Sequence, residues 1–204
     1  MKIKIIAVLL CFLLLFLSSC NRKNKIYEDA LRSAFEIKYG LAIDVLESWN
    51  SAGRTEAIVQ LSRNHEFEFW VSVDKNNEDL QDDFFIKYTE NEIKKSIEKH
   101  VLDYFDSSIN LYVLVDIYMA SSEQAGSFYE TNSIDELLNY LSEEDVIDIS
   151  IFIEKSEEKQ NQDEIASNDF LEYSLKKREK TYVKIFYVDN DKIEEMKNNN
   201  LLNL

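Results

Sequence analysis

Both cysteines of this chain, Cys11 and Cys20, lie in its first 20 residues, and the rest of the sequence has none. A disulfide framework is therefore excluded for the body of the protein, whose stability must come from a packed core. Hydrophobic residues make up 45% of the 204-residue chain, which is enough to build one. Proline is absent and glycine occurs three times, so linker-rich architectures and Gly-rich phosphate loops are not expected.

The first residues have the composition of an export signal. Lys2 and Lys4 precede an unbroken apolar run over residues 5–17. As a helix this run would reach only about 20 Å, well short of the ~30 Å hydrocarbon core of a membrane. A basic start, a short apolar run and small residues after it are the parts of a cleaved secretory signal. An uncleaved membrane anchor is the alternative.

The segment LSSC, residues 17–20, resembles the lipobox of bacterial lipoproteins. The resemblance implies cleavage after Ser19 and a diacylglyceryl thioether on Cys20, which becomes the new N-terminus, with an acyl group such as palmitate added to its amine. It also implies a signal peptide over residues 1–19, a lipidated tether over residues 20–25, and a place on the outer face of the cell membrane, or in the outer membrane of a Gram-negative source. Two acyl chains give a stable anchor, whereas one binds only reversibly.

The net charge of the chain excludes some classes of binding partner and permits others. Asp and Glu number 39 against 23 Lys and Arg, a formal net charge of −16. Nucleic acid is excluded as a default partner, because phosphate contacts need clustered Lys and Arg. A cationic partner such as a basic peptide, a toxin domain or Ca²⁺ is electrostatically permitted. An acidic surface that only keeps the protein dispersed is the alternative.

The hydrophobic pattern of residues 26–204 predicts a single α+β domain with a largely antiparallel sheet and helices packed on it. Residues 26–39 have the spacing of an amphipathic helix, with Gly40 as its C-cap. An N-terminal β-meander of three short-linked antiparallel strands is expected next, over residues 41–49, 55–63 and 66–74.

The segment 80–105 has helical composition, and its apolar stripe changes register midway, where Thr89 and Glu92 form a capping-box pattern. We expect either a kinked helix or two consecutive helices. The later elements expected are a central strand over 109–120 covered on both faces, a helix capped by Ser133 and Glu136, an alternating strand over 146–154, a helix over 162–178, a strand over 181–189, and a short helix with Ile193 and Met196.

Two segments of the body, KYGLAIDVLE (38–47) and FEFWVSVD (67–74), resemble small uncharacterised lipoproteins of low-GC Gram-positive bacteria. In the second segment Trp70 is an aromatic residue on an otherwise polar strand face. Such a residue more often lies under a neighbouring loop or helix, and a contact site at Trp70 is the alternative interpretation. The resemblance implies no activity.

Asp116 is the carboxylate with the best claim to chemistry. It interrupts the apolar run 109–120, and an Asp in a strand buried on both faces would have a raised pKa. It could then serve in contact or carboxylate catalysis. The alternative is an edge or end position, where the carboxylate reaches water or a backbone N–H.

No metal or cofactor site is expected from the remaining sequence. His65 and His100 lack the paired spacing of a zinc site, and no G-x-S-x-G elbow is present. DKNNED (74–79) departs from the EF-hand pattern, since Asp79 stands where glycine is required. This segment and DND (189–191) are better interpreted as turns or helix N-caps.

The sequence thus predicts a lipid-anchored, extracytoplasmic, non-enzymatic α+β module that acts by contact with another macromolecule or with the cell envelope. Three alternatives stay open. They are an immunity-type or inhibitor protein that neutralises a basic toxin, an envelope hydrolase that uses carboxylates such as Asp116, and a solute-binding lipoprotein of an importer.

Overall fold

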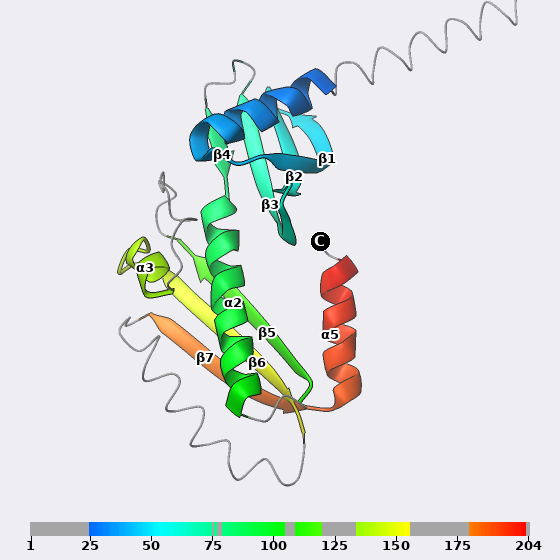
Figure 1. Cartoon of the computed structure of the whole chain (residues 1–204), viewed down its shortest axis with the longest axis vertical. Coiled ribbons are helices and arrows are strands. Elements are labelled where there is room, and N and C mark those ends of the chain that lie inside the picture. Colours follow the sequence, from blue (N-terminus) through cyan, green and yellow to red (C-terminus); the bar gives the residue numbers. More distant parts are fainter. Residues whose placement is uncertain are drawn as a thin grey trace, which may run out of the picture. The chain divides into compact units, whose positions relative to one another are not determined.

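The computed structural model describes residues 25–74, 76, 79–104, 109–119, 134–155 and 180–202. The chain divides into two compact units, Met1–Phe84 and Phe85–Leu204, which are described separately here (Figure 1). Both contain helix and sheet, and most strand pairs are antiparallel, so the α+β class is confirmed. Whether residues 26–204 fold as one cooperative domain stays a prediction. Ser19, Cys20 and the helix expected over 162–178 lie outside the described residues.

The first unit is a four-stranded sheet with a helix over residues 25–39 packed across one face (Figure 1). The helix and the antiparallel meander expected from the sequence are confirmed. The strands lie in the order of their sequence: β1 (Ile43–Ser51), β2 (Arg54–Leu61), β3 (Asn64–Asp74) and β4 (Leu80–Asp82).

Strand β4 corrects one expectation, because residues 80–82 were expected to begin a helix. They run antiparallel to the end of β3 instead, with Leu80 opposite Val73. The reason is the turn before them, where the backbone N–H of Asp74 donates to the carbonyl oxygen of Asp79 at 3.4 Å and returns the chain along β3.

Aromatic rings fill the core of the first unit between helix 25–39 and the sheet. Phe35 lies 4.7 Å from Tyr39 and 5.3 Å from both Phe69 and Phe84, measured between ring centroids. None of the four is more than 3% exposed. Burying a ring of this size stabilises a fold by roughly 1.5–3 kcal/mol, so this cluster is a main source of stability in a unit without disulfides.

The turns of the first unit follow the glycine signals. Gly40 ends helix 25–39 with φ 68°, and its N–H donates to the carbonyl of Glu36 at 2.7 Å, which confirms the predicted C-cap. Ala52 and Gly53 both have positive φ, 46° and 90°, between β1 and β2. Two positive φ angles are the mark of a type I′ hairpin turn, whose twist matches that of the strands.

The second unit contains a three-stranded sheet in the order β5 (Leu111–Tyr118), β6 (Val146–Glu154), β7 (Thr181–Val188). The β5–β6 pair is antiparallel and the β6–β7 pair is parallel. The alternation expected for β6 is confirmed, since every second residue is buried: Ile147, Ile149, Ile151 and Ile153. Three helices belong to the described part of this unit: α2 (Phe84–Tyr104), α3 (Ile134–Asn139) and α5 (Asn190–Leu202).

Helix α2 is continuous, so the two-helix alternative is wrong. Thr89 lies inside the helix with its side chain fully buried and caps nothing. The helix begins at Phe84, whose N–H donates to Asp82 Oδ1 at 3.2 Å. No helix in the described ranges is both long enough and apolar enough to span a membrane.

Strand β5 also differs from expectation. It is the edge strand of the described sheet rather than a central strand covered on both faces. One face is buried, whereas Leu114 and Tyr118 on the other face are 36% and 61% exposed. Apolar residues occur at both odd and even positions of this strand, but they are not all buried. The outer face of the strand carries exposed apolar side chains.

Candidate functional site

Strand pairing gathers both tryptophans of the chain on one face of the first sheet. Trp49 of β1 lies opposite Glu56 of β2, and Trp70 of β3 lies opposite Ile58 of β2. Successive side chains of a strand point to opposite faces, so residues 56 and 58 share a face that the buried Ala57 does not. We call Trp49, Glu56, Ile58 and Trp70 the tryptophan face; it lies opposite helix 25–39.

A β-bulge decides that Trp49 belongs to this face. The register of β1 against β2 shifts between Val45 and Glu47. Without the shift, Trp49 would have the same parity as the buried Ile43 and would point into the core. The extra residue, Leu46, reverses the parity, and Trp49 emerges 37% exposed.

The two indoles flank one carboxylate. Trp70 Nε1–H donates to Glu56 Oε2 at 3.2 Å, and Glu56 is the direct cross-strand neighbour of Trp49. Directly opposed side chains in an antiparallel pair have Cβ atoms about 4.5–5.5 Å apart. Trp70 itself is half-buried, and its backbone N–H donates to Asp83 Oδ1 at 2.6 Å. The face therefore presents an oriented carboxylate between two aromatic rings.

Further carboxylates border the tryptophan face. Glu47 lies opposite Ile58, and Glu68 lies opposite Gln60, so both share its side of the sheet. Among the described residues, Glu47, Glu56 and Glu68 form no ion pair. This side of the sheet therefore carries an excess of negative charge.

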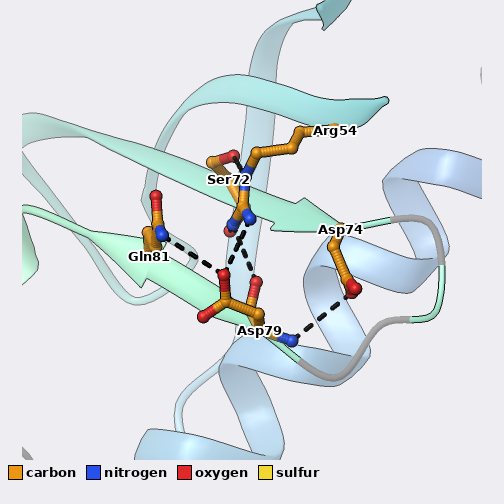
Figure 2. Close-up of polar contacts among 5 residues, drawn as sticks. All are labelled: Arg54, Ser72, Asp74, Asp79 and Gln81. Carbon is orange, nitrogen blue, oxygen red and sulfur yellow. Dashed lines mark hydrogen bonds and ion pairs between the residues drawn. The ribbon is translucent and has the colours of Figure 1, made fainter. Parts of the chain in front are cut away.

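Arg54 lies at the end of the same face, and its positive charge is paired with the carboxylate of Asp79 (Figure 2). Its Nη1 and Nη2 donate to the carboxylate and the carbonyl of Asp79 at 2.8 Å each. Its Nε donates to Ser72 Oγ at 2.7 Å. Such forked, charge-assisted bonds are strong, and they fasten β2 to the segment that joins β3 and β4.

The Arg54 contacts also bear on Ser72. This residue is fully buried, and its Oγ accepts the hydrogen bond from Arg54 Nε. Asp74 and Asp79, the two ends of the segment 74–79, are joined by a hydrogen bond from the N–H of Asp79 to Asp74 Oδ1 at 3.4 Å (Figure 2). This contact agrees with the turn expected here; residues 75, 77 and 78 lie outside the described residues.

Asp82 is a buried carboxylate that the sequence did not single out. Its side chain is 2% exposed and accepts hydrogen bonds from Lys38 Nζ and Tyr39 Oη, both at 2.9 Å. Burial, together with the charge of Asp82, raises the pKa of Tyr39 far above its usual range. An Asp shortly before a helical run is an N-cap signal, and this signal could have found Asp82. Its role in the described structure is to hold helix 25–39 to the chain at the start of α2.

Asp116 lies on β5 in the second unit, whereas Trp70 lies on β3 in the first unit. It is half-buried and stands directly opposite Asp148 of β6. Lys184 Nζ lies 3.1 Å from the Asp148 carboxylate. Asp116 therefore lacks the apolar cover on both faces that the sequence led us to expect, because β5 is an edge strand of the described sheet.

Glu90 of α2 is a largely buried carboxylate of the second unit. Its side chain is 12% exposed and accepts hydrogen bonds from Lys87 Nζ at 2.9 Å and from the backbone N–H of Ile117 at 3.0 Å. Burial raises the pKa of Glu90, because loss of hydration outweighs the attraction of Lys87, and the charge of Asp116 adds to the rise. Glu90 thus satisfies a backbone group on the open edge of β5.

The two histidines lie on separate elements, His65 on β3 and His100 on α2. His65 Nε2 lies 3.6 Å from Asp44 Oδ2, and His100 is exposed on α2. No group of three His, Cys, Asp or Glu residues suited to a metal occurs in the part of the chain that the structure describes.

Comparison with known proteins gives a distant structural similarity. No protein-family model matches the chain, and no curated protein matches it. The crystal structure of a DUF5037 family protein from Ruminococcus gnavus is similar, at 14% sequence identity and a TM-score of 0.44, over 83% of this chain and 78% of that one. No function follows from a similarity at this level.

Proposed function

We propose that this protein is a lipid-anchored extracytoplasmic module that acts by binding another macromolecule rather than by catalysis. The observation that carries the proposal is the segment LSSC at residues 17–20, directly after a short apolar run. Its resemblance to a lipobox assigns Cys20 as the lipidated residue. The diacylglyceryl group would hold the protein at the outer face of the cell membrane.

Three described carboxylates with close polar partners have structural roles, which supports a binding module. Asp79 neutralises Arg54, Asp82 holds Lys38, and Glu90 accepts a backbone hydrogen bond.

Metabolic labelling with an alkyne analogue of a fatty acid tests the anchor. The wild-type protein is expected to take up label and to sediment with membranes. Cys20→Ala is expected to lose the label, since the acceptor sulfur is gone, whereas Cys11→Ala is the matched control and should keep it. Undiminished labelling of Cys20→Ala would refute the site.

A second candidate function is immunity against a basic toxin, and the unpaired acidic groups beside the tryptophan face favour it. A cell that loses the gene should then become sensitive to a cationic toxin made by its neighbours. Loss of the gene without any such sensitivity would exclude this function.

The envelope-hydrolase alternative has no support from the described geometry. It is tested by Asp116→Asn, which should abolish any turnover while leaving the fold intact if Asp116 is catalytic. Unchanged turnover would exclude a catalytic role for Asp116.

A further inference from the structure

The tryptophan face is a sheet face without a covering helix in the described part of the first unit. Helix 25–39 packs on the opposite side, with Leu31 and Phe35 fully buried against the core. The outer side keeps Leu46 and Trp49 46% and 37% exposed. Exposed apolar groups gathered on one face, rimmed by polar groups, mark interaction surfaces.

We propose that the tryptophan face is the docking surface for a cationic segment of another polypeptide, whose Lys or Arg side chain lies against the indoles and pairs with Glu56. The inference rests on the proposed binding function and names its surface and its class of partner.

The geometry suits a cation held between a ring and a carboxylate. An ammonium or guanidinium group is attracted to the face of an indole, and Arg in particular stacks on it. The indole N–H of Trp70, at 3.2 Å, fixes one oxygen of Glu56 and leaves the other for the partner. Trp49 lies on the other side of Glu56 along the sheet, and Ile58 is half-buried between the strands of both tryptophans. A flat guanidinium therefore finds an aromatic wall and a charge-assisted acceptor at adjacent positions.

Charge selects a basic polypeptide over the other occupants. An apolar partner would bury Glu56 without compensation, which is costly. A second copy of this chain brings a formal charge of −16 and the same carboxylates, so two such faces repel each other. Arg54 does not cancel the charge of the face, because Asp79 already holds it. A segment with Lys or Arg can form cation–π contacts with the indole rings and ion pairs with the acidic groups.

Tryptophan fluorescence, excited selectively over that of tyrosine, reports on this surface alone, because the chain has two tryptophans and both lie on it. The membrane-extracted protein is titrated, at ~0.15 M salt to screen distant charges, with a short peptide of alternating arginine and threonine. The matched probe has citrulline in place of arginine, which keeps the shape and removes the charge. We expect a saturable change in tryptophan emission with the arginine peptide and none with the citrulline peptide.

Charge-matched variants locate the binding. Glu56→Gln should weaken binding of the arginine peptide about tenfold, the effect of one lost charge-assisted contact. Glu36→Gln makes the same change of charge on the exposed side of helix 25–39 and should change the affinity less than twofold. Trp49→Ala, at an exposed position that leaves the core intact, should weaken binding several-fold, with Trp70 as the remaining reporter.

The outcomes separate this inference from the anchoring proposal. An equal loss of affinity in Glu36→Gln and Glu56→Gln would show diffuse attraction and overturn the docking surface. A flat titration, equal binding of the citrulline peptide, or quenching that depends only on protein concentration, as self-association would give, would overturn it as well. Labelling of Cys20 is unaffected by any of these results, so the anchor can stand while the surface fails.

Discussion

Asp82 joins parts of the first unit that lie far apart in the sequence. Its carboxylate, 2% exposed, accepts hydrogen bonds from Lys38 and Tyr39, which precede it by 44 and 43 residues. The charge is removed from water but receives three donors, since the N–H of Phe84 also bonds it. A buried charge with satisfied hydrogen bonds is tolerated, whereas removing the charge leaves its hydrogen-bond donors without a charged acceptor.

Asp82→Asn is therefore expected to lower the free energy of unfolding by about 2–3 kcal/mol, because hydrogen bonds to a charged group are lost while the shape is kept. Tyr39→Phe removes one of these bonds and should cost about 1 kcal/mol. Urea denaturation followed by circular dichroism measures both. Glu36→Gln, on the exposed side of helix 25–39, is the control and should stay within about 0.5 kcal/mol of wild type. An Asp82→Asn variant as stable as this control would contradict the role of Asp82.

At the residue scale the sequence predicted what depends on neighbours along the chain. Gly40 could be predicted as a cap, since only the adjacent helix requires its positive φ. Trp70 could be placed on the outer face by simple alternation. Trp49 could not, because a bulge three positions before it, at Leu46, reverses its parity, and a bulge has no clear sequence signal. Asp82 was missed because its burial depends on residues far away in the chain.

At the element scale, β5 is held by a helix at one edge and a strand at the other. Its backbone N–H at Ile117 donates to Glu90 of α2, while β6 pairs along the opposite edge. Edge strands offer unpaired backbone groups to other chains, and an acidic side chain at the edge discourages such pairing. Glu90 thus stabilises the edge strand β5 and also discourages its pairing with another chain.

Glu90 gives this element a defined pH dependence. Burial raises its pKa above the ordinary value of 4.5, with Lys87 opposing the rise and Asp116 adding to it. The folded chain therefore binds this proton more tightly than the unfolded chain. The contribution of Glu90 to stability is fully present below about pH 4.5 and is lost as pH rises through the raised pKa.

Glu90→Gln keeps an acceptor for Ile117 and does not titrate. Its stability relative to wild type is expected to rise between pH 4.5 and pH 7, measured as the unfolding free energy at each pH. Glu98, whose pKa burial also raises, is present in both proteins and cancels in the difference. Glu90→Ala leaves the N–H of Ile117 unpaired and should cost about 1–3 kcal/mol at all pH values. A difference between Glu90→Gln and wild type that does not vary with pH would contradict the assignment.

The elements were predicted best where one hydrophobic period was unambiguous. The isoleucines of β6 alternate with polar residues, and the strand lies where the pattern placed it. Strand β5 has apolar residues at both parities, a pattern that does not distinguish a covered central strand from an edge strand with exposed apolar groups. The short β4 looked helical because three residues carry no period of their own, and its pairing with β3 decides its form.

At the scale of the whole molecule, the proposed lipid anchor and the proposed binding surface depend on different kinds of signal. The anchor stays a prediction from the sequence, and it depends on a local resemblance to a lipobox at residues 17–20. The surface required the pairing of three strands, since its residues come from β1, β2 and β3. The acidic composition bears on both, because it favours cationic partners and opposes contact between copies.

The proposed lipid anchor is best tested by mass spectrometry of the N-terminal peptide of the membrane-extracted protein. We expect the mature chain to begin at Cys20, without residues 1–19, and the mass of this cysteine to be increased by a diacylglyceryl group. An N-terminal peptide that still contains residues 1–19, with an unmodified Cys20, would contradict it.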